Sequence, residues 1–514
     1  MKKTTIALLS TALIAGLSAQ AAATPSDDNT TVDTLAETSK YDVENWQVTQ
    51  PPFKLNEVAI STNETTWSSL DVSPNGKFMI FDMLGDLYKV DIKGGNATPL
   101  IQDFAWNIHP AISPDGKQVA FVSDRDGLSN VWVMDIDGTH LKQITREKKD
   151  IIHAPKWSPD GEYLVVTKGI MSSRSIPAGE IWMYHKSGGD GLQIKARNSG
   201  KRDQQNIADP AFSHDGRYIY FTENTVPGSR FEYNRDPLEG IFAITRYDRE
   251  SGDERRYISG TGGAVVPTPS PDGKYVAFVR RVKDKTALFL KDIKTGTETP
   301  LTFALERDMQ EGFGSEGYFT YFDWTPDASA IVYWSRGKFH IINVDSKETD
   351  TLNVHIDTTV KFADALRFPV DVAPDNVEVK MTRWSQMSPN GKSILFQALG
   401  KLYVRDVKSG KVKRLTKQND HDEYYPRYSN DGKSIVYTTW NDQDLGTVHV
   451  VSARGGKGKV ISVQPGHYIE PSFSTDGKKV VFRKFTGGSL LDPKYSVDPG
   501  IYVANLKNDT VEKV

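Results

Sequence analysis

Residues 112–138 read ISPDGKQVAFVSDRDGLSNVWVMDIDG, and this stretch decides the fold. A Ser-Pro-Asp-Gly turn precedes two runs of alternating apolar and polar residues, which a second polar turn separates. Alternation with period two is typical of β-strands. In the turn, proline fixes one φ angle, aspartate bonds to its own backbone, and glycine adopts positive φ. The stretch therefore predicts short antiparallel strands joined by tight turns.

The same turn, with small changes, occurs nine times along the chain. Successive copies are 40 to 63 residues apart, which is the range of one propeller blade. Each copy is followed by further short alternating runs, so that four strands are predicted per repeat. Such WD40-like units bury both faces only by stacking radially. The sequence predicts an all-β fold, a β-propeller with four-stranded blades. The turns begin at Ser73, Ser113, Ser158, Ser213, Ser270, Thr325, Ser388, Ser429 and Ser474.

Two features of the repeats predict where one ring ends. Repeat one, residues 73–91, closely matches repeat seven, residues 388–406. Repeats one, six and seven also lack a proline three positions before the turn, a position that we assign to the first residue of a strand. The other repeats carry it, as Pro110, Pro155, Pro210, Pro267, Pro426 and Pro471.

This order predicts one six-bladed ring at residues 51–370 and three blades of a second ring at residues 371–514. The alternative is a single nine-bladed ring, which exceeds the usual range of about four to eight blades. A partial ring leaves an apolar sheet face and an unpaired edge exposed, so it predicts self-association.

The repeated pattern resembles the propeller repeats of TolB, a family of bacterial periplasmic proteins, over roughly residues 60–514. Four longer blocks, 179–185, 307–311, 363–369 and 439–442, are similar to the N-terminal propeller region of secreted amidohydrolase-family proteins. In those proteins a metal-dependent hydrolase barrel follows the propellers. The resemblance implies a propeller that binds a ligand or partner, and that gates substrate for an amidohydrolase domain outside this chain.

The N-terminus predicts export to the periplasm. Residues 1–23 form a signal peptide, with Lys2 and Lys3 before an apolar stretch and cleavage after Ala21 or Ala23. The apolar stretch is too short to span a membrane, so no membrane insertion is expected. Residues 24–50 are predicted to be a disordered leader. The formal net charge of −3 gives no indication of nucleic-acid binding, and the chain contains no cysteine.

Candidate ligand-binding residues lie before the first strand of the blades, near the central channel. Histidines and carboxylates gathered there could bind a cation or a charged peptide terminus. Their spacing matches no standard metal site, so neither a metal nor another cofactor is predicted. Long loops at 167–179, 223–239, 303–318 and 484–499 predict a binding face on the same side. The candidates are His109, His153, Asp209, Arg307, Asp308, Gln310, Glu311, His421, Glu423, His467 and Glu470.

The motifs of hydrolases are missing from the sequence. No His-x-His pair, H-E-x-x-H or G-x-S-x-G occurs among its residues. We therefore expect no catalytic residues in this chain, and hydrolase chemistry only through an associated domain. Two alternatives stay open: a stand-alone TolB-like protein–protein interaction module, and a propeller enzyme that uses its central channel.

Overall fold

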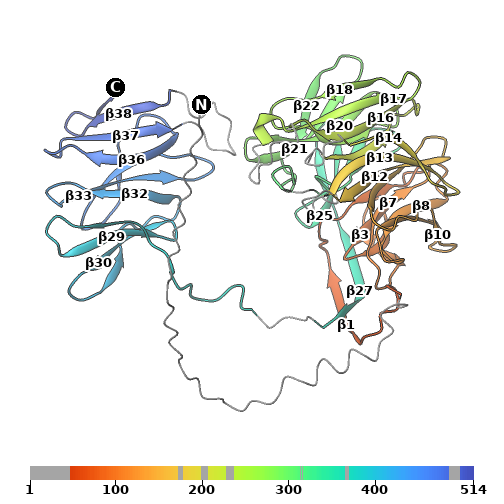
Figure 1. The fold of residues 1–514 in the computed structure, drawn as a ribbon, viewed down its shortest axis with the longest axis horizontal. Helices are drawn as coiled ribbons and strands as arrows, with labels where there is room; N and C mark the ends of the chain where they lie inside the picture. The colour runs from red at the N-terminus through yellow and green to blue at the C-terminus, as the bar shows by residue number, and fades with distance from the viewer. Residues whose placement is uncertain are drawn as a thin grey trace, which may run out of the picture. The chain divides into compact units, whose positions relative to one another are not determined.

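The computed structural model describes residues 47–171, 177–197, 206–226, 237–312, 314, 317–364, 370–485 and 498–514 (Figure 1). Within these ranges the regular secondary structure is β-strand apart from one 3-10 turn, η2 (Pro237–Glu239). The predicted signal peptide, its cleavage sites at Ala21 and Ala23, and the leader up to residue 46 lie outside the described residues. These remain predictions.

Six antiparallel four-stranded sheets cover the first part of the chain and confirm the predicted blade. Sheet 1 contains β2 (Leu70–Val72), β3 (Phe78–Met83), β4 (Asp86–Asp91) and β6 (Thr98–Ile101); sheet 2 contains β7 (Asn107–Ile112), β8 (Gln118–Ser123), β9 (Asn130–Asp135) and β10 (Lys142–Gln143). Sheet 3 contains β11 (Ile151–Trp157), β12 (Tyr163–Met171), β13 (Pro177–His185) and β14 (Leu192–Lys195); sheet 4 contains β15 (Ile207–Phe212), β16 (Tyr218–Asn224), β17 (Phe242–Asp248) and β18 (Glu254–Ile258). Sheet 5 contains β19 (Val265–Pro269), β20 (Tyr275–Val282), β21 (Lys285–Asp292) and β22 (Glu298–Thr302); sheet 6 contains β23 (Asp323–Trp324), β24 (Ala330–Ser335), β25 (Lys338–Asn343) and β26 (Thr349–Leu352).

Three further four-stranded sheets follow residues 370–382, which contain no strand. Sheet 7 contains β28 (Arg383–Met387), β29 (Ser393–Ala398), β30 (Lys401–Asp406) and β31 (Val412–Arg414). Sheet 8 contains β32 (Asp422–Tyr428), β33 (Ser434–Trp440), β34 (Val448–Ser452) and β35 (Lys459–Val460). Sheet 9 contains β36 (His467–Phe473), β37 (Lys479–Phe485), β38 (Gly500–Asn505) and β39 (Thr510–Lys513).

Sheet 1 packs against sheet 6, although more than 200 residues separate their inner strands in the sequence. The backbone N–H of Leu70 donates to the carbonyl oxygen of Tyr321 at 3.0 Å. Phe81 of sheet 1 contacts Phe339 of sheet 6, with ring centroids 4.8 Å apart, inside one buried cluster. A six-bladed ring requires this contact between sheets 6 and 1, and the blade count stays a prediction. We keep residues 51–370 and 371–514 as proposed domain limits.

A strand pair outside the blades joins the start of this six-sheet unit to its end. β1 (Leu55–Thr62) pairs antiparallel with β27 (Val354–Ala363), from Leu55 opposite Ala363 to Thr62 opposite Ile356 (Figure 1). β5 (Gly95–Asn96) adds to β27 in parallel. The repeat pattern does not include these segments, and the sequence did not predict their pairing. The ladder stabilises closure because it ties together two ends that would otherwise separate.

A β-bulge interrupts the innermost strand of seven sheets, and it corrects one prediction. Pro110 is the fourth residue of β7, at a register shift, whereas we expected these prolines at the first residue of a strand. A bulge accommodates proline because the bulged residue needs no ladder hydrogen bond. The residue at the bulge has positive φ in each case: His109, Ala154, Asp209, Val266, Trp384, Tyr425 and Glu470. Proline follows it in six of the seven, Trp384 being the exception.

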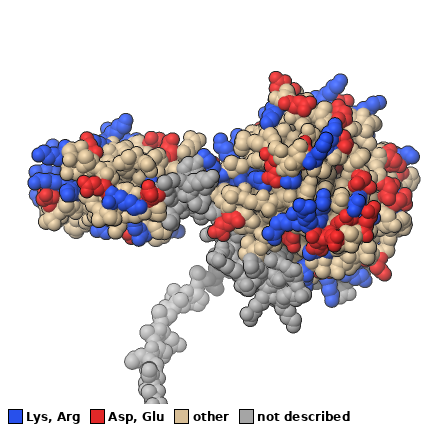
Figure 2. Space-filling model, turned by 90° about the horizontal axis from the view of Figure 1, so that it is seen from above, with Lys and Arg blue, Asp and Glu red and all other residues tan. Residues whose placement is uncertain are grey.

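One face of the molecule shows no strong separation of positive and negative side chains (Figure 2). On the face drawn in Figure 2, Lys and Arg are interspersed with Asp and Glu. No helix in the described ranges is long and apolar enough to cross a membrane.

Candidate functional site

A cavity of about 420 Å³ lies at the centre of the six-sheet unit, and all six sheets line it. Its rim includes Pro74, Pro114, Pro271 and Pro326, each the second residue of a repeated turn. The cavity therefore opens on the face that carries these turns. Its volume is in the range of sites that bind small molecules or short peptide segments.

Three charged side chains meet at this cavity: Asp71, Lys156 and Asp323. The ammonium group of Lys156 lies 3.0 Å from Oδ1 of Asp71, with side chains only 21% and 11% exposed. Burial and the nearby Asp71 together raise the pKa of Asp323 to about 7, because Lys156 offsets them only in part. Burial alone would lower the pKa of Lys156, but Asp71 and Asp323 outweigh it and raise that pKa. The group contains two carboxylates for one ammonium.

The repeat itself positions these charges, because all three stand two residues before the first residue of a turn. Oδ2 of Asp71 accepts the backbone N–H of Ile112 in sheet 2 at 2.6 Å. Oδ2 of Asp323 accepts the N–H of Val72 in sheet 1 at 2.9 Å. Each carboxylate thus links its own sheet to the next one. In sheets 2 and 4 the same position is alanine, which leaves the space that forms the cavity.

The predicted residues His109 and Asp209 lie in the same channel and share a contact with Tyr321. The Tyr321 hydroxyl donates to Oδ1 of Asp209 at 2.9 Å, and the His109 ring packs edge-on against Tyr321 at 4.9 Å. Burial raises the pKa of Asp209 to about 6, although hydrogen bonds from Tyr321 and Thr222 oppose the rise. Tyr321 therefore connects two candidates that the sequence could not show to be neighbours.

His109 and His153 are buried and neutral at pH 7. Burial, with smaller contributions from the nearby His153 and Lys156, lowers the pKa of His109 to about 3. Burial also lowers the pKa of His153 to about 4. Nδ1 of His109 accepts the backbone N–H of Ala154 at 3.4 Å, so this ring links sheets 2 and 3. Among the described residues, no group of three His, Asp or Glu side chains is placed to hold a metal ion.

The four candidates from 307 to 311 surround a buried arginine. Asp308 receives two hydrogen bonds from Arg281, at 3.0 Å from Nε and 2.8 Å from Nη2, and both side chains are buried. Glu311 accepts from Nη1 of Arg281 at 2.7 Å and from the exposed Arg307. The buried Gln310 donates to the carbonyl oxygen of Gly262 at 3.1 Å. These contacts hold the connection between sheets 5 and 6, so their evident role is structural.

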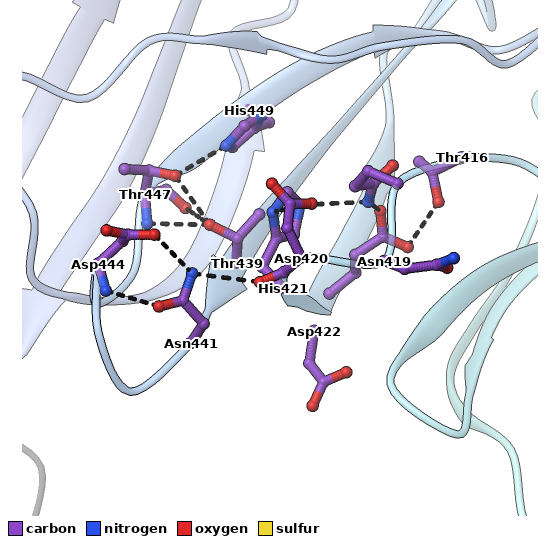
Figure 3. Close-up of polar contacts among 12 residues, drawn as sticks. Thr416, Asn419, Asp420, His421, Asp422, Thr439, Asn441, Asp444, Thr447 and His449 are labelled. Atoms are coloured by element: carbon purple, nitrogen blue, oxygen red, sulfur yellow. Dashed lines mark hydrogen bonds and ion pairs between the residues drawn. The ribbon is translucent and has the colours of Figure 1, made fainter. Parts of the chain in front are cut away.

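His421 belongs to a polar network just before the first strand of sheet 8 (Figure 3), and Glu423 is the second residue of that strand. Glu423 is buried and accepts from the backbone N–H of Leu402 at 2.8 Å and from Thr416 at 2.7 Å. The His421 ring lies 5.4 Å from His449, whose pKa burial lowers to about 4. The Asp-rich tip beside them is an Asx turn, since Oδ1 of Asn441 accepts two backbone N–H groups.

His467 and Glu470 lie on the inner strand of sheet 9 and do not approach each other through any described contact. The His467 ring packs edge-on between Trp440 and Phe485, and burial lowers its pKa. Glu470 is exposed, with one oxygen 3.9 Å from Arg483. The predicted candidates thus fall into separate groups, and only His109, His153 and Asp209 share the channel of the six-sheet unit.

The sequence reasoning missed Asp71, Lys156, Asp323 and Tyr321. A signal for the three charges was present, because they occupy a repeat position that is small or uncharged in sheets 2, 4 and 5. The predicted binding face with long loops is on the opposite side from this cavity. Residues 172–176, 227–236, 313, 315–316 and 486–497 of those loops lie outside the described residues, so that prediction stays open.

Comparison with known proteins agrees with this architecture. A family model described as the TolB beta propeller domain matches residues 56–187. A Protein TolB homolog from Chlorobium chlorochromatii is 27% identical over 169 residues, which cover 32% of this chain and 31% of that protein. This chain is similar to TolB β-propeller proteins. Its predicted link to amidohydrolases does not appear in these matches.

Another relative matches a larger share of this chain. A Tricorn protease homolog from Saccharolobus solfataricus is 21% identical over 385 residues, covering 66% of this chain and 34% of that protein. The chain spans about a third of the length of these two relatives and about a quarter of two further ones. The crystal structure of TolB from Acinetobacter baumannii is 20% identical, with a TM-score of 0.42, and covers 57% of this chain and 65% of that chain.

Proposed function

We propose that this TolB-like propeller is a protein-interaction module that binds an extended segment of a partner protein in its central cavity. The observation that carries the proposal is the cavity itself, which all six sheets line on the turn face. A partner segment could enter there without disturbing the blades, because the cavity lies between inner strands that are already hydrogen-bonded to their neighbours.

The lining indicates which segment would fit. Proline rings and the aromatic side chains Trp157, Phe212 and Trp324 supply apolar walls. Asp71, Asp323 and Lys156 carry one excess negative charge when both carboxylates are ionised. Charged groups in a partly buried site favour a partner of opposite sign, because screening by water is weak there. We infer a preference for an apolar segment with a basic group, such as a lysine side chain or an amino terminus.

Substitution of Ala211 by lysine tests this site. Ala211 lines the cavity at the same repeat position that holds Lys156 in sheet 3, so the fold accepts lysine at that position. The new side chain fills space and cancels the excess negative charge. Peptides selected from a display library against the unaltered chain should bind the A211K variant at least about tenfold more weakly, a loss of about 1.4 kcal/mol. Fluorescence anisotropy with the selected peptides measures this loss.

Arg307→Ala is the matched control, since Arg307 is exposed and belongs to the opposite, long-loop face. It should leave the affinity for the same peptides unchanged. Peptides that lose affinity in R307A but bind A211K normally would place the site on the loop face and contradict the proposal. Selection that yields no peptide enriched in Lys or Arg would contradict the predicted charge preference.

Two further assignments, the location of the chain and the domain that it serves, extend the same proposal. We propose that the chain is exported to the periplasm, and that its propellers present substrate to an amidohydrolase domain. The similarity of the four sequence blocks supports the second point, whereas the matches name TolB and Tricorn relatives. A stand-alone TolB-like interaction module is the alternative, and the turn-face cavity serves either role equally well. The third possibility, a propeller enzyme, requires catalysis within the channel.

An activity measurement separates these roles. The purified chain is expected to hydrolyse neither amide nor ester substrates, with or without added zinc, because hydrolase motifs are missing from its sequence. Turnover by the unaltered chain that disappears in Asp209→Asn would instead indicate channel catalysis. Turnover that persists in D209N but requires zinc would contradict the assignment of hydrolase chemistry to a separate domain.

A further inference from the structure

The last sheet of the chain presents an apolar face that no described residue covers. Along β37 the side chains alternate between buried and exposed, so that one face of sheet 9 packs on sheet 8 and the other faces outward. Val481, Phe485 and Ile501 on the outward face are 39%, 41% and 51% exposed. Arg483 of β37 pairs with Ile501 of β38 and belongs to the same row. We call these four residues the sheet 9 end face.

Sheet 7 presents a second such face, formed by Ile394, Phe396 and Tyr403. All three are only partly buried, whereas Leu395 and Leu402, which point to the opposite side, are fully buried against sheet 8. Phe396 and Tyr403 stack on each other with ring centroids 5.8 Å apart. We call these three residues the sheet 7 end face.

The six-sheet unit shows what such a face contacts when a neighbour is present. Repeat one has Met79, Phe81 and Tyr88 at the positions of the sheet 7 end face, and all three are fully buried. Phe81 and Tyr88 stack at 5.6 Å, almost as their counterparts do, but sheet 6 also covers them. Sheet 7 therefore carries the docking surface of a first blade, and no sheet among the described residues packs on it as sheet 6 packs on sheet 1.

Sheet 9 has the complementary surface. In repeat six, Val332 and Trp334 of β24 face sheet 1 and are buried in the cluster that contains Phe81. Counted from the first residue of each turn, Val481 and Arg483 occupy the positions of Val332 and Trp334. Val481 is thus the same residue type as Val332, whereas Arg483 stands where repeat six has Trp334. At that position the guanidinium group of Arg483 can lie over aromatic rings, which attract it.

We propose that sheets 7–9 form a closed six-bladed ring with the same three sheets of a second copy of this chain. In this ring the sheet 9 end face of one copy packs on the sheet 7 end face of the other, twice, about a twofold axis. Each junction repeats the contact between sheets 6 and 1 of the six-sheet unit. Two copies give six sheets, as in that unit, whereas three copies would give nine and exceed the usual blade range.

The extent of the two end faces suits a stable dimer. Sheets 7 and 9 together contain eight strands of three to seven residues, and every second side chain of a strand points to one face. Each copy therefore contributes roughly twenty outward side chains, close to the roughly 20–30 residues a side of a standard interface. The inner parts of both faces are apolar or aromatic, as the central part of an interface is.

Sedimentation equilibrium of the purified full chain at micromolar concentration tests the proposal. We expect a dimer that dissociates to a single-chain species on dilution. The double variant Val481→Glu/Phe485→Glu should raise the dissociation constant at least about a hundredfold, because it places charges in both apolar junctions. These side chains are exposed in the single chain, so the variant should retain the circular dichroism and melting temperature of the monomeric form.

Leu192→Glu is the matched control, since Leu192 is an exposed leucine on the outermost strand of sheet 3. It should leave the dissociation constant unchanged. A monomer at all accessible concentrations would overturn the proposal, as would a ladder of larger species, which indicates open head-to-tail association. A dimer that L192E weakens and V481E/F485E does not would place the interface on the six-sheet unit and would equally overturn it.

Discussion

Replacement of Asp308 by alanine is expected to destabilise the six-sheet unit by about 3–5 kcal/mol. Arg281 and Asp308 are both buried and joined by two hydrogen bonds. Removal of the carboxylate leaves a guanidinium group in the core with only Glu311 as a charged partner at its other edge. The hydroxyl of Thr286, which donates to Asp308, and the N–H of Gln310 lose their acceptor as well. Guanidinium denaturation measures the change in unfolding free energy.

Two comparisons make this expectation specific to the buried pair. Arg307→Ala removes an exposed charge next to it and should change the free energy of unfolding by less than about 0.5 kcal/mol. The double variant Arg281→Met/Asp308→Ala should be more stable than D308A alone, because no unpaired charge remains in the core. A loss below about 1 kcal/mol for D308A would mean that water or a rearranged Glu311 satisfies Arg281.

The second large effect is a dependence of stability on pH that His109 controls. Its pKa is about 3 in the folded chain, below the ordinary value of 6.5, because the ring is buried. Between pH 6.5 and about pH 3, His109 binds a proton in the unfolded chain but not in the folded chain. The contribution of His109 to stability is therefore complete above pH 6.5 and decreases as the pH falls. At pH 4.5 the expected loss is about 2–3 kcal/mol.

His109→Asn isolates this contribution. Asparagine tolerates the positive φ at this bulge, and its amide oxygen can accept the N–H of Ala154 in place of Nδ1. Asn has no charge to gain, so the decrease in unfolding free energy between pH 7 and pH 4.5 should be smaller in H109N by about 2–3 kcal/mol. Asp209, Asp323, His153 and Lys156 remain in both proteins, so their own titration cancels in the comparison. Equal pH dependence of both proteins would show that His109 is already charged in the fold.

Residues close in the sequence made the blade predictable. Ser113, Asp115 and Gly116 form a turn whose hydrogen bonds join residues no more than five positions apart, so its chemistry is readable without knowledge of the rest of the chain. The alternating runs on both sides give strands of the expected length. For the same reason the proline before six of the nine turns was recognised but wrongly placed. Its bulge depends on the pairing of β7 with β8, which proline alone does not reveal.

The candidate site was only partly predictable because it is built between sheets. Asp209 and His109 were chosen as polar residues near the channel, but Tyr321, which contacts both, is 112 and 212 positions away. Asp71 and Lys156 meet across 85 positions. No local pattern encodes such distances. The number of positions between two contacting residues depends instead on how many sheets lie between their strands along the chain.

The sequence by itself determined the all-β class, the four-stranded blade, its nine copies and the likeness of repeat seven to repeat one. Each of these rests on turn chemistry and strand periodicity, which act over a few residues. Only the tertiary structure decided that sheet 6 packs on sheet 1, that β1 pairs with β27, and that the charged cavity opens on the turn face. These features need contacts between residues distant in the chain, and closure of the sheets is what brings such residues together.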